Sequence, residues 1–530
     1  MKNKIRLWSA MLCTLLLAAC GSDLDYAQFI PKEAAVVSRI DVAQLTEKGN
    51  FADNEKLSTI LKKAVQESRL TSKGKVVAEK IISDPQVTGI DFRKPIYAYY
   101  IENEQGGHGG IIAAVLNFDD LQSFVNYISR EEGLKAFKAY KDVRYQVWGN
   151  TIIAFNDRWL IFKDLQNVEP EEAIDLLLAR EDLAPEQTIN SVESYKRMAD
   201  RDGIWSVVLR GDMLAKLLSE TNNRYAIASE YQNLANFDFI FDFQADDGKM
   251  SIDMETYGNT EEGQRKLKEA SKLIGEIQGE YADYIDAEAL FSVVSNVKGK
   301  EIINLLSKNG FSAAELREYA PYVEPISGDV AITMNALKPN LKGLDYRLFA
   351  HINNPQPYNS LRSTLANVPT FNEYATNEYS FSLGSIIPTS DLITEMGLAD
   401  ETAAPNNGNL MAYFGVHNSN SLFTCFSISS NAFDKVTKPI DKDYLHGRIA
   451  YVRFNSTNAL DVAKLMAKNT GEENDYETKI GLHVLGLIDY LDFYATTDYK
   501  AKLNVVMRDK DKNALASFVE EFTTLINIFS

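Results

Sequence analysis

The chain has 530 residues, of which 45% are hydrophobic and 11% aromatic, so it is long enough for about two to four folded domains and too apolar to be disordered. It carries 74 acidic against 55 basic residues, a formal net charge of −19. This acidity argues against binding to nucleic acid and against electrostatic docking on anionic lipid.

The first twenty residues have the pattern of a bacterial lipoprotein signal. Basic residues precede an apolar run, 7–19, which is shorter than the roughly 20 residues that a membrane-spanning helix needs. The run ends in Leu17-Ala18-Ala19-Cys20, which resembles the lipobox of bacterial lipoproteins. The resemblance implies that residues 1–19 are removed and that Cys20 becomes the site of lipid attachment, with acyl chains such as palmitate as the anchor. The alternative is an ordinary secretory signal with a chance cysteine at its end.

The residues that follow Cys20 bear on the final location. Gly21 follows the cysteine in place of Asp, so the common mark for retention in the inner membrane is absent, and we expect the outer membrane. Ser22, Asp23 and Asp25 resemble the acidic tether that some Gram-negative lineages use to send lipoproteins to the cell surface. A solvated linker is the alternative, which leaves open whether the protein faces the periplasm or the outside.

The first part of the mature chain alternates strand and helix patterns. Val36–Ile40 is expected to be a strand, and Asp41, with Gln44 three residues later, is expected to cap a short helix. The following elements are expected in order: a helix from Asn54, a helix over 75–82, a hairpin with strands 95–101 and 110–118 around a glycine-rich turn at 102–109, a helix from Asp119, strands 145–148, 151–155 and 159–162, and a helical connector at 169–182.

The pattern then starts again and continues to the end of the chain. The expected elements are a strand at 203–209, a helix at 213–220, a hairpin of 237–243 and 250–257 across Asp246-Asp247-Gly248, a helix at 261–274, strands at 289–295, 328–334, 347–352, 410–416, 422–429 and 447–454, a helix at 458–467, strands at 491–496 and 500–507, and a terminal helix.

The element order predicts an α+β fold of antiparallel sheets covered by amphipathic helices. A strand–helix and a hairpin–helix unit recur weakly along the chain, which indicates a repeated module in two lobes; shared helix-cap chemistry is the alternative. The expected division is a signal peptide (1–19), a lipidated tether (20–28), an N-terminal α+β region (29–320, with a possible break near 185–202) and a C-terminal α+β region (321–530).

Three stretches carry a resemblance to a known family. They are Phe29 to Val37 behind the lipobox, Ala154 to Leu160, and Pro325 to Ala331. Together they resemble a family of uncharacterised lipoproteins from the Bacteroidetes, the domain of unknown function DUF 4836. The resemblance spans nearly the whole mature chain. It implies the placement at the outer membrane and the fold, and it supplies no activity and no functional residues.

Catalytic and cofactor motifs are absent from the sequence. The five histidines lack metal-ligand spacing and no Gly-x-Ser-x-Gly elbow occurs. After loss of Cys13 and acylation of Cys20, Cys425 is the one free thiol, so no intramolecular disulfide can form; its strand pattern predicts a buried side chain and not a nucleophile. We therefore expect no catalytic residue and no cofactor, and Cys20 is the one site residue.

One segment copies part of a calcium-binding loop. Asp509, Asp511, Asn513 and Glu520 match ligand positions 1, 3, 5 and 12 of such a loop. Ala514 stands where the loop needs glycine, and a helical pattern runs through the second half. We therefore expect a solvated turn with a helix cap, and no metal ligand is assigned.

These observations favour a non-enzymatic, lipid-anchored protein of the cell envelope that presents a binding or assembly surface. Its expected partners are the membrane, through the anchor, and an envelope protein or glycan, with no nucleic acid. The alternative is a hydrolase of glycan or peptidoglycan with an unrecognised carboxylate pair. A cleft with two carboxylates about 5–10 Å apart would favour the hydrolase, and an exposed apolar patch would favour the binding protein.

Overall fold

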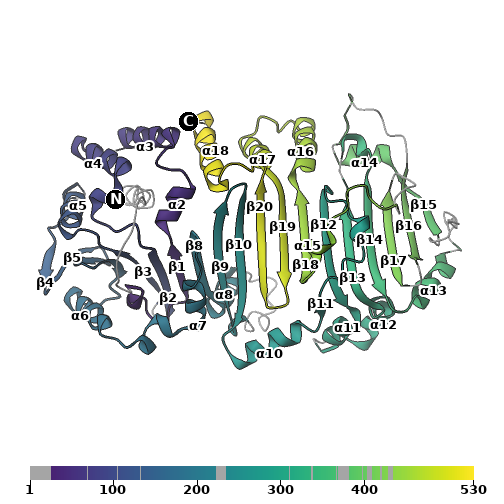
Figure 1. The fold of residues 1–530 in the computed structure, drawn as a ribbon, viewed down its shortest axis with the longest axis horizontal. Helices are drawn as coiled ribbons and strands as arrows, with labels where there is room; N and C mark the ends of the chain where they lie inside the picture. The colour runs from purple at the N-terminus through teal and green to yellow at the C-terminus, as the bar shows by residue number, and fades with distance from the viewer. Residues whose placement is uncertain are drawn as a thin grey trace. The chain divides into compact units, whose positions relative to one another are not determined.

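The computed structural model describes residues 26–529, apart from 69, 104–105, 132, 222–233, 309–310, 336–337, 366, 368–380, 397, 401, 403–408, 418–419 and 428–433. The fold is α+β, with antiparallel strand pairing throughout (Figure 1). The chain forms two compact units. The first holds the described residues up to Gln264 together with those from Asp509 onward, and the second holds Arg265–Arg508.

The first unit contains a sheet in which every neighbouring pair of strands is antiparallel. The strand order is β4-β5-β6-β7-β3-β2-β1-β8-β9-β10. The strands are β1 (Val36–Ile40), β2 (Ile96–Asn103), β3 (Gly106–Ala114), β4 (Lys138–Tyr140), β5 (Val143–Trp148), β6 (Thr151–Phe155), β7 (Trp159–Asp164), β8 (Trp205–Arg210), β9 (Phe237–Asp246) and β10 (Lys249–Gly258).

The helices of the first unit cover both faces of this sheet. They are α2 (Val42–Lys48), α3 (Glu55–Glu67), α4 (Ser72–Ser83), α5 (Phe118–Glu131), α6 (Pro170–Glu181), α7 (Glu193–Ala199), α8 (Gly211–Thr221) and α18 (Ala514–Phe529), with 3-10 turns that include η1 (Tyr26–Phe29) and η2 (Pro85–Thr88). Figure 1 shows α5 and α6 on opposite sides of the strands. Helix α10 (Glu261–Ala270) crosses the division between the units.

Side chains that alternate along the strands build two separate cores in the first unit. Trp159 and Ile161 of β7 pack with Ile174 of α6 in one core, and Leu160 packs with Phe124 of α5 in the other. Both faces of a strand are then buried, which explains the unbroken apolar run at residues 152–155 of β6.

The second unit is also built on an antiparallel sheet. Its order is β15-β16-β17-β14-β13-β12-β18-β19-β20, and β11 pairs with the end of β12 that β18 leaves free. The strands are β11 (Ile274–Gly275), β12 (Phe291–Lys298), β13 (Ile326–Met334), β14 (Asp345–Ile352), β15 (Phe381–Pro388), β16 (Asn409–His417), β17 (Ser421–Ser427), β18 (Arg448–Asn455), β19 (Ile488–Thr496) and β20 (Lys500–Met507).

The helices of the second unit mostly lie in the connections between consecutive strands. They are α11 (Gly299–Lys308), α12 (Ala313–Val323), α13 (Gln356–Leu365), α14 (Thr389–Glu395), α15 (Lys442–Leu445), α16 (Ser456–Thr470) and α17 (Tyr476–Leu487), with the 3-10 turns η5 (Ala282–Tyr284) and η6 (Pro339–Leu341). Among the described residues of the whole chain, none of the helices has the length and hydropathy needed to span a membrane.

One row of polar side chains crosses the sheet of the second unit in register. Its members, each directly opposite the next, are Asn504, Asp492, Arg453, Ser292, Thr333, Arg347 and Cys425. Two neighbouring pairs within the row are in hydrogen-bond contact: Asn504 Nδ2 donates to Asp492 Oδ1 at 2.6 Å, and the Oγ atoms of Ser292 and Thr333 lie 3.3 Å apart. Cys425 is 1% exposed within this row, which confirms the prediction of a buried strand cysteine.

Predictions that rest on a helix cap or a tight turn are confirmed at two positions. Asp41 Oδ1 accepts from Gln44 N at 2.9 Å and begins α2 as expected. Gly248, at φ +64°, turns β9 into β10. The glycine-rich turn expected at 102–109 is wrong, because β2 runs to Asn103 and β3 starts at Gly106. The glycines are instead part of β3. Glycine is needed there because a side chain at Gly107 would meet the Tyr100 ring and one at Gly110 would meet the Tyr99 ring.

The expected regions and the compact units have different bounds. The boundary expected near residue 321 falls between β12 and β13, which pair over eight residues inside the second unit. The second unit begins instead at Arg265, and the segment from Asp509 belongs to the first unit, where Gly248 N donates to Lys512 O at 2.8 Å. The division by sequence stays a prediction about regions of the chain. The helix expected over 261–274 ends at Ala270, and β11 begins at Ile274.

Candidate functional site

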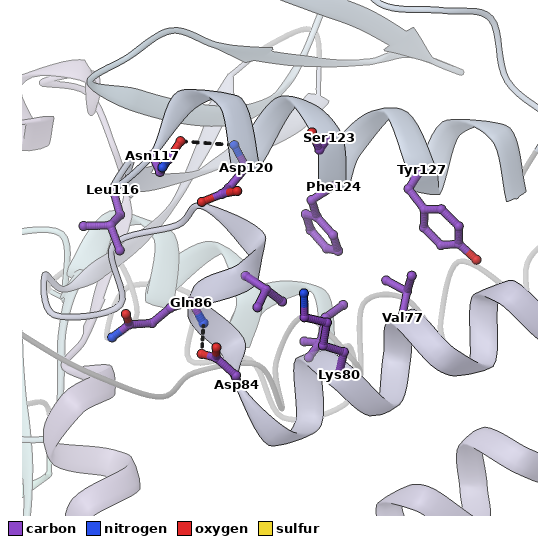
Figure 2. A pocket seen from close by; sticks show the side chains of 12 residues that line it. Val77, Lys80, Asp84, Gln86, Leu116, Asn117, Asp120, Ser123, Phe124 and Tyr127 are labelled. Carbon is purple, nitrogen blue, oxygen red and sulfur yellow. Dashed lines mark hydrogen bonds between the residues drawn. The ribbon is translucent and has the colours of Figure 1, made fainter.

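A groove with a volume of about 630 Å³ lies between α4, η2 and α5 in the first unit. Figure 2 shows α5 along one side and α4 with η2 along the other. This volume falls within the range of ligand pockets in proteins, about 300–1,000 Å³.

Caps at both helices fix the walls of the groove. Thr71 caps α4, and its hydroxyl accepts from Gly74 N at 3.1 Å. Asn117 precedes α5, and its Oδ1 accepts from Asp119 N at 3.0 Å and Asp120 N at 3.1 Å. An Asn that satisfies the first free amides of a helix holds the entry angle of the chain, so Asn117 sets where α5 faces α4.

The floor of the groove is apolar. Ile81 of α4 and Phe124 of α5 are buried in the same core cluster, and Val77 and Val87 pack against that cluster from the rim. Leu116 at one end of the groove is 37% exposed. An apolar floor beside exposed apolar groups is typical of a surface that a partner covers.

Polar groups line the rim of the groove. In Figure 2 the side chains of Lys80 and Asp120 extend into the groove from opposite walls. Asp84 Oδ1 accepts from Gln86 N at 3.2 Å, which ends α4 and starts η2. Among the described residues we find no ion-pair or hydrogen-bond partner for the Lys80 ammonium group. Lys80 is therefore available to an anionic or hydrogen-bonding ligand.

Tyr127 adds a phenol to the lining of the groove. Burial raises the pKa of the Tyr127 phenol at one end, so this group stays protonated as a hydrogen-bond donor at neutral pH. Among the described carboxyl groups, those with a shifted pKa all have it lowered: Glu102, Asp175, Glu315, Asp498 and Glu520. Each of these pKa values is lowered mainly by a hydrogen bond to a neighbouring side chain or backbone amide.

The candidate site residues from the sequence are not among the residues that line the groove. Cys20 lies outside the described residues. The candidate ion ligands do not converge: Asn513 Oδ1 accepts from Leu515 N at 3.0 Å, and Asp509 Oδ1 accepts from Asp511 N at 3.1 Å. Glu520 pairs with Lys512, which lowers the pKa of its carboxyl group. The segment is a turn with a helix cap in the first unit. Within the described ranges, no cluster of three or more His, Cys, Asp or Glu side chains suits a metal ion.

The groove residues were not singled out from the sequence. The spacing of Leu121, Phe124, Val125 and Ile128 predicts the inward face of α5, but it does not say that α4 leaves a gap against that face. The one local signal near the groove is Asn117, which marks the start of α5 together with Asp119 and Asp120 in the first helical turn. Helix spacing predicts faces; the distance between two helices depends on tertiary packing.

Comparisons with known proteins give a family and nothing beyond it. No curated protein and no solved structure matches the chain. The family model described as domain of unknown function DUF4836 matches residues 26–515, which is nearly the whole chain and includes the groove. The chain therefore belongs to the DUF4836 family.

Proposed function

We propose that the protein is a non-enzymatic, lipid-anchored component of the cell envelope whose folded part binds a partner in the groove between α4 and α5. The lipobox motif at Leu17–Cys20 supports an anchor in the outer membrane through Cys20. The acidic residues Asp23 and Asp25 are compatible with either face of that membrane. The partner would be an envelope protein or a glycan.

The observation that carries the binding role is the composition of the groove. Its apolar floor of Ile81 and Phe124 lies beside the phenol of Tyr127 and the Lys80 ammonium group, which has no ion-pair or hydrogen-bond partner among the residues that the structure describes. Apolar contact supplies affinity, and a few fixed polar groups supply orientation, which is the usual division in ligand sites. A bound segment would rest its apolar part on the floor and turn a carboxylate or another acceptor toward Lys80.

We also propose that the α+β fold is built from a repeated structural module. A strand, one or more helices and a hairpin recur in β1-β2-β3, β8-β9-β10, β12-β13-β14, β15-β16-β17 and β18-β19-β20. In each set the first strand pairs with the second and the second with the third. Duplication of one module would place extra copies side by side, and the groove would be formed by α4 of the first copy and by α5, which follows that copy in the chain.

The test is affinity purification of the tagged, lipidated protein from its own membranes, beside a variant that fills the groove. Ser123 lies on the wall of the groove, and Ser123→Trp would occupy the space above the floor. Arg130→Trp adds the same side chain at an exposed position of α5 that does not line the groove. We expect a component that co-purifies with wild type and Arg130→Trp and is lost with Ser123→Trp. A lone protein in all three preparations would contradict the proposal.

A further inference from the structure

A second cavity lies in the second unit, between the face of its sheet and the segment around η5. Its volume is about 280 Å³, and the side chains of four aromatic residues line it: Tyr281, Tyr284, Phe349 and Phe423. The carboxylate of Glu280 and the hydroxyl of Ser421 also face it.

Strand register brings two of the rings together. Phe349 of β14 lies directly opposite Phe423 of β17, on the same face of the sheet. Their neighbours across the next strands are Ala331 of β13 and Gly415 of β16, which are small. The two rings therefore form a wall that small residues flank on both sides.

The segment before and through η5 brings the other two rings against this wall. The Tyr281 ring stacks on Phe349 with centroids 5.2 Å apart and an interplanar angle of 19°, and the Tyr284 ring lies 5.1 Å from Phe349 at 40°. Tyr281 also donates from its hydroxyl to Ser421 Oγ at 3.2 Å. The aromatic rings are held by packing and by this hydrogen bond, so their positions are fixed before any ligand arrives.

Buried Asp329 holds the acidic side of the cavity in place. Asp329 is 1% exposed, and its two oxygens accept from Gln278 N and Glu280 N, each at 3.0 Å. These bonds place Glu280 at the cavity, where its Oε2 lies 2.8 Å from Nδ1 of His351. Neither lysine nor arginine is among the residues that line the cavity.

Two carboxylates, those of Glu280 and Asp329, lie close to the rings of the cavity. Burial raises the pKa of the Tyr281 phenol, its hydrogen bond to Ser421 lowers it, and the two carboxylates raise it further. The titratable side chains close to the cavity include Glu280, Asp329, His351, His417, Tyr281 and Tyr284, and the exposed ion pair of Lys435 with Asp283 lies near Tyr284. An anionic ligand would meet the Glu280 carboxylate, and the lining includes the imidazole of His417 but no lysine or arginine, which favours a cation over an anion.

We propose that this cavity binds a small organic cation, of the class in which methyl groups surround a charged nitrogen. Aromatic faces attract such cations through the ring quadrupole, and aromatic cages with one carboxylate are a common way to bind quaternary ammonium groups. The methyl groups would contact the rings of Tyr284, Phe349 and Phe423, and the charge would lie toward Glu280. The site is separate from the groove of the first unit and does not rest on the binding role proposed for it.

The test compares a cation with a neutral molecule of the same shape. Choline and its neutral isostere 3,3-dimethylbutan-1-ol would be titrated calorimetrically into the full lipidated chain in a detergent that lacks quaternary ammonium groups. We expect choline to bind and the isostere to bind at least about tenfold more weakly. Equal binding of the two, or no binding of choline, would overturn the proposal, because an apolar pocket alone does not distinguish them.

Two variants and a control assign the effect to the cavity. Glu280→Gln keeps the size of the side chain and removes its charge, and we expect it to weaken choline binding about tenfold. Glu288→Gln is the matched control, because Glu288 is exposed and pairs with Lys438 away from the cavity. Tyr284→Leu removes one ring without touching the carboxylate and is expected to weaken binding as well. Unchanged binding in a folded Glu280→Gln or Tyr284→Leu chain would overturn the proposal. Ser123→Trp in the groove should leave choline binding intact.

Discussion

The carboxylate of Asp242 occupies the space that a side chain at Gly203 would need. An ideal Cβ at Gly203 would lie 2.2 Å from Asp242 Oδ1, and Asp242 is fully buried. The carboxylate cannot move away easily, because Oδ1 accepts from Ser206 Oγ at 2.6 Å and Oδ2 accepts from Gln244 Nε2 at 3.0 Å. A buried acid on β9 thus requires glycine at position 203, two residues before β8 begins.

This relationship predicts the effect of Gly203→Ala. The added methyl group forces the buried carboxylate out of its hydrogen bonds, so the free energy of unfolding should fall by about 1–3 kcal/mol. Urea unfolding followed by circular dichroism measures the loss. Gly481→Ala in α17 is the control, because nothing lies within 4 Å of its added Cβ. There alanine should leave stability unchanged or raise it by up to about 1 kcal/mol through helix propensity. Equal effects at the two positions would contradict the account.

A second prediction concerns Asp329 and the segment that it holds. Asp329→Asn replaces one acceptor oxygen with an amide donor facing the N–H groups of Gln278 and Glu280. We expect a loss of about 2–3 kcal/mol in the unfolding free energy of the second unit. Hydrogen exchange at those two amides should quicken more than exchange at the paired strands β16 and β17. Exchange that quickens evenly across the unit would show that Asp329 does not act on this segment.

The buried thiol gives a prediction about pH. Burial raises the pKa of the Cys425 thiol above its ordinary value, and the nearby Asp345 carboxylate raises it further. The thiol therefore ionises in the unfolded chain before it does so in the folded chain. Its contribution to stability is present below the unfolded pKa of about 8.5 and falls as the pH rises above that value.

The measurement is alkylation of a chain that begins at residue 21, in which Cys425 is the sole cysteine. In the folded protein the rate of reaction with iodoacetamide should stay low and nearly flat from pH 7 to pH 9. In denaturant it should be at least about 100-fold faster and should rise with pH as the thiolate forms. A native rate that follows the denatured one would show that the thiol is accessible.

The anchor is tested by a single substitution. Cys20→Ala removes the thiol that the lipobox presents for acylation, so labelling with radioactive palmitate should disappear and the protein should leave the membrane fraction. Cys425→Ala is the control, and we expect it to keep both the label and the membrane association. Retained label in Cys20→Ala would refute the anchor.

Much of the fold could be predicted where the signal is local. The expected strand Val36–Ile40 is β1, and the connector expected at 169–182 is α6 (Pro170–Glu181). Alternating apolar residues and capping side chains act within a few residues, so one sequence is enough to detect them. β15 and α17 were not predicted, and the apolar residues of α17 lack a clear helical face.

The two cavities could not be predicted for a different reason. Phe349 and Phe423 become neighbours only through the pairing of β14 with β17, which are separated in sequence by β15 and β16. Lys80 and Asp120 line one groove because α4 and α5 pack on the same core. Each of these residues has an ordinary local pattern, and the site arises from strand order and helix packing. Cys20 could be predicted because a lipobox consists of four consecutive residues and does not depend on tertiary structure.

The central claim is that the groove between α4 and α5 binds a component of the envelope, and photo-crosslinking in intact cells tests it most directly. A photoreactive amino acid at position 123 reports on what lies over the groove floor, and the same residue at position 130 of α5 reports on the exposed surface nearby. The account predicts a discrete crosslinked product from position 123 that is absent from position 130. No product from position 123, or the same product from both positions, would contradict it.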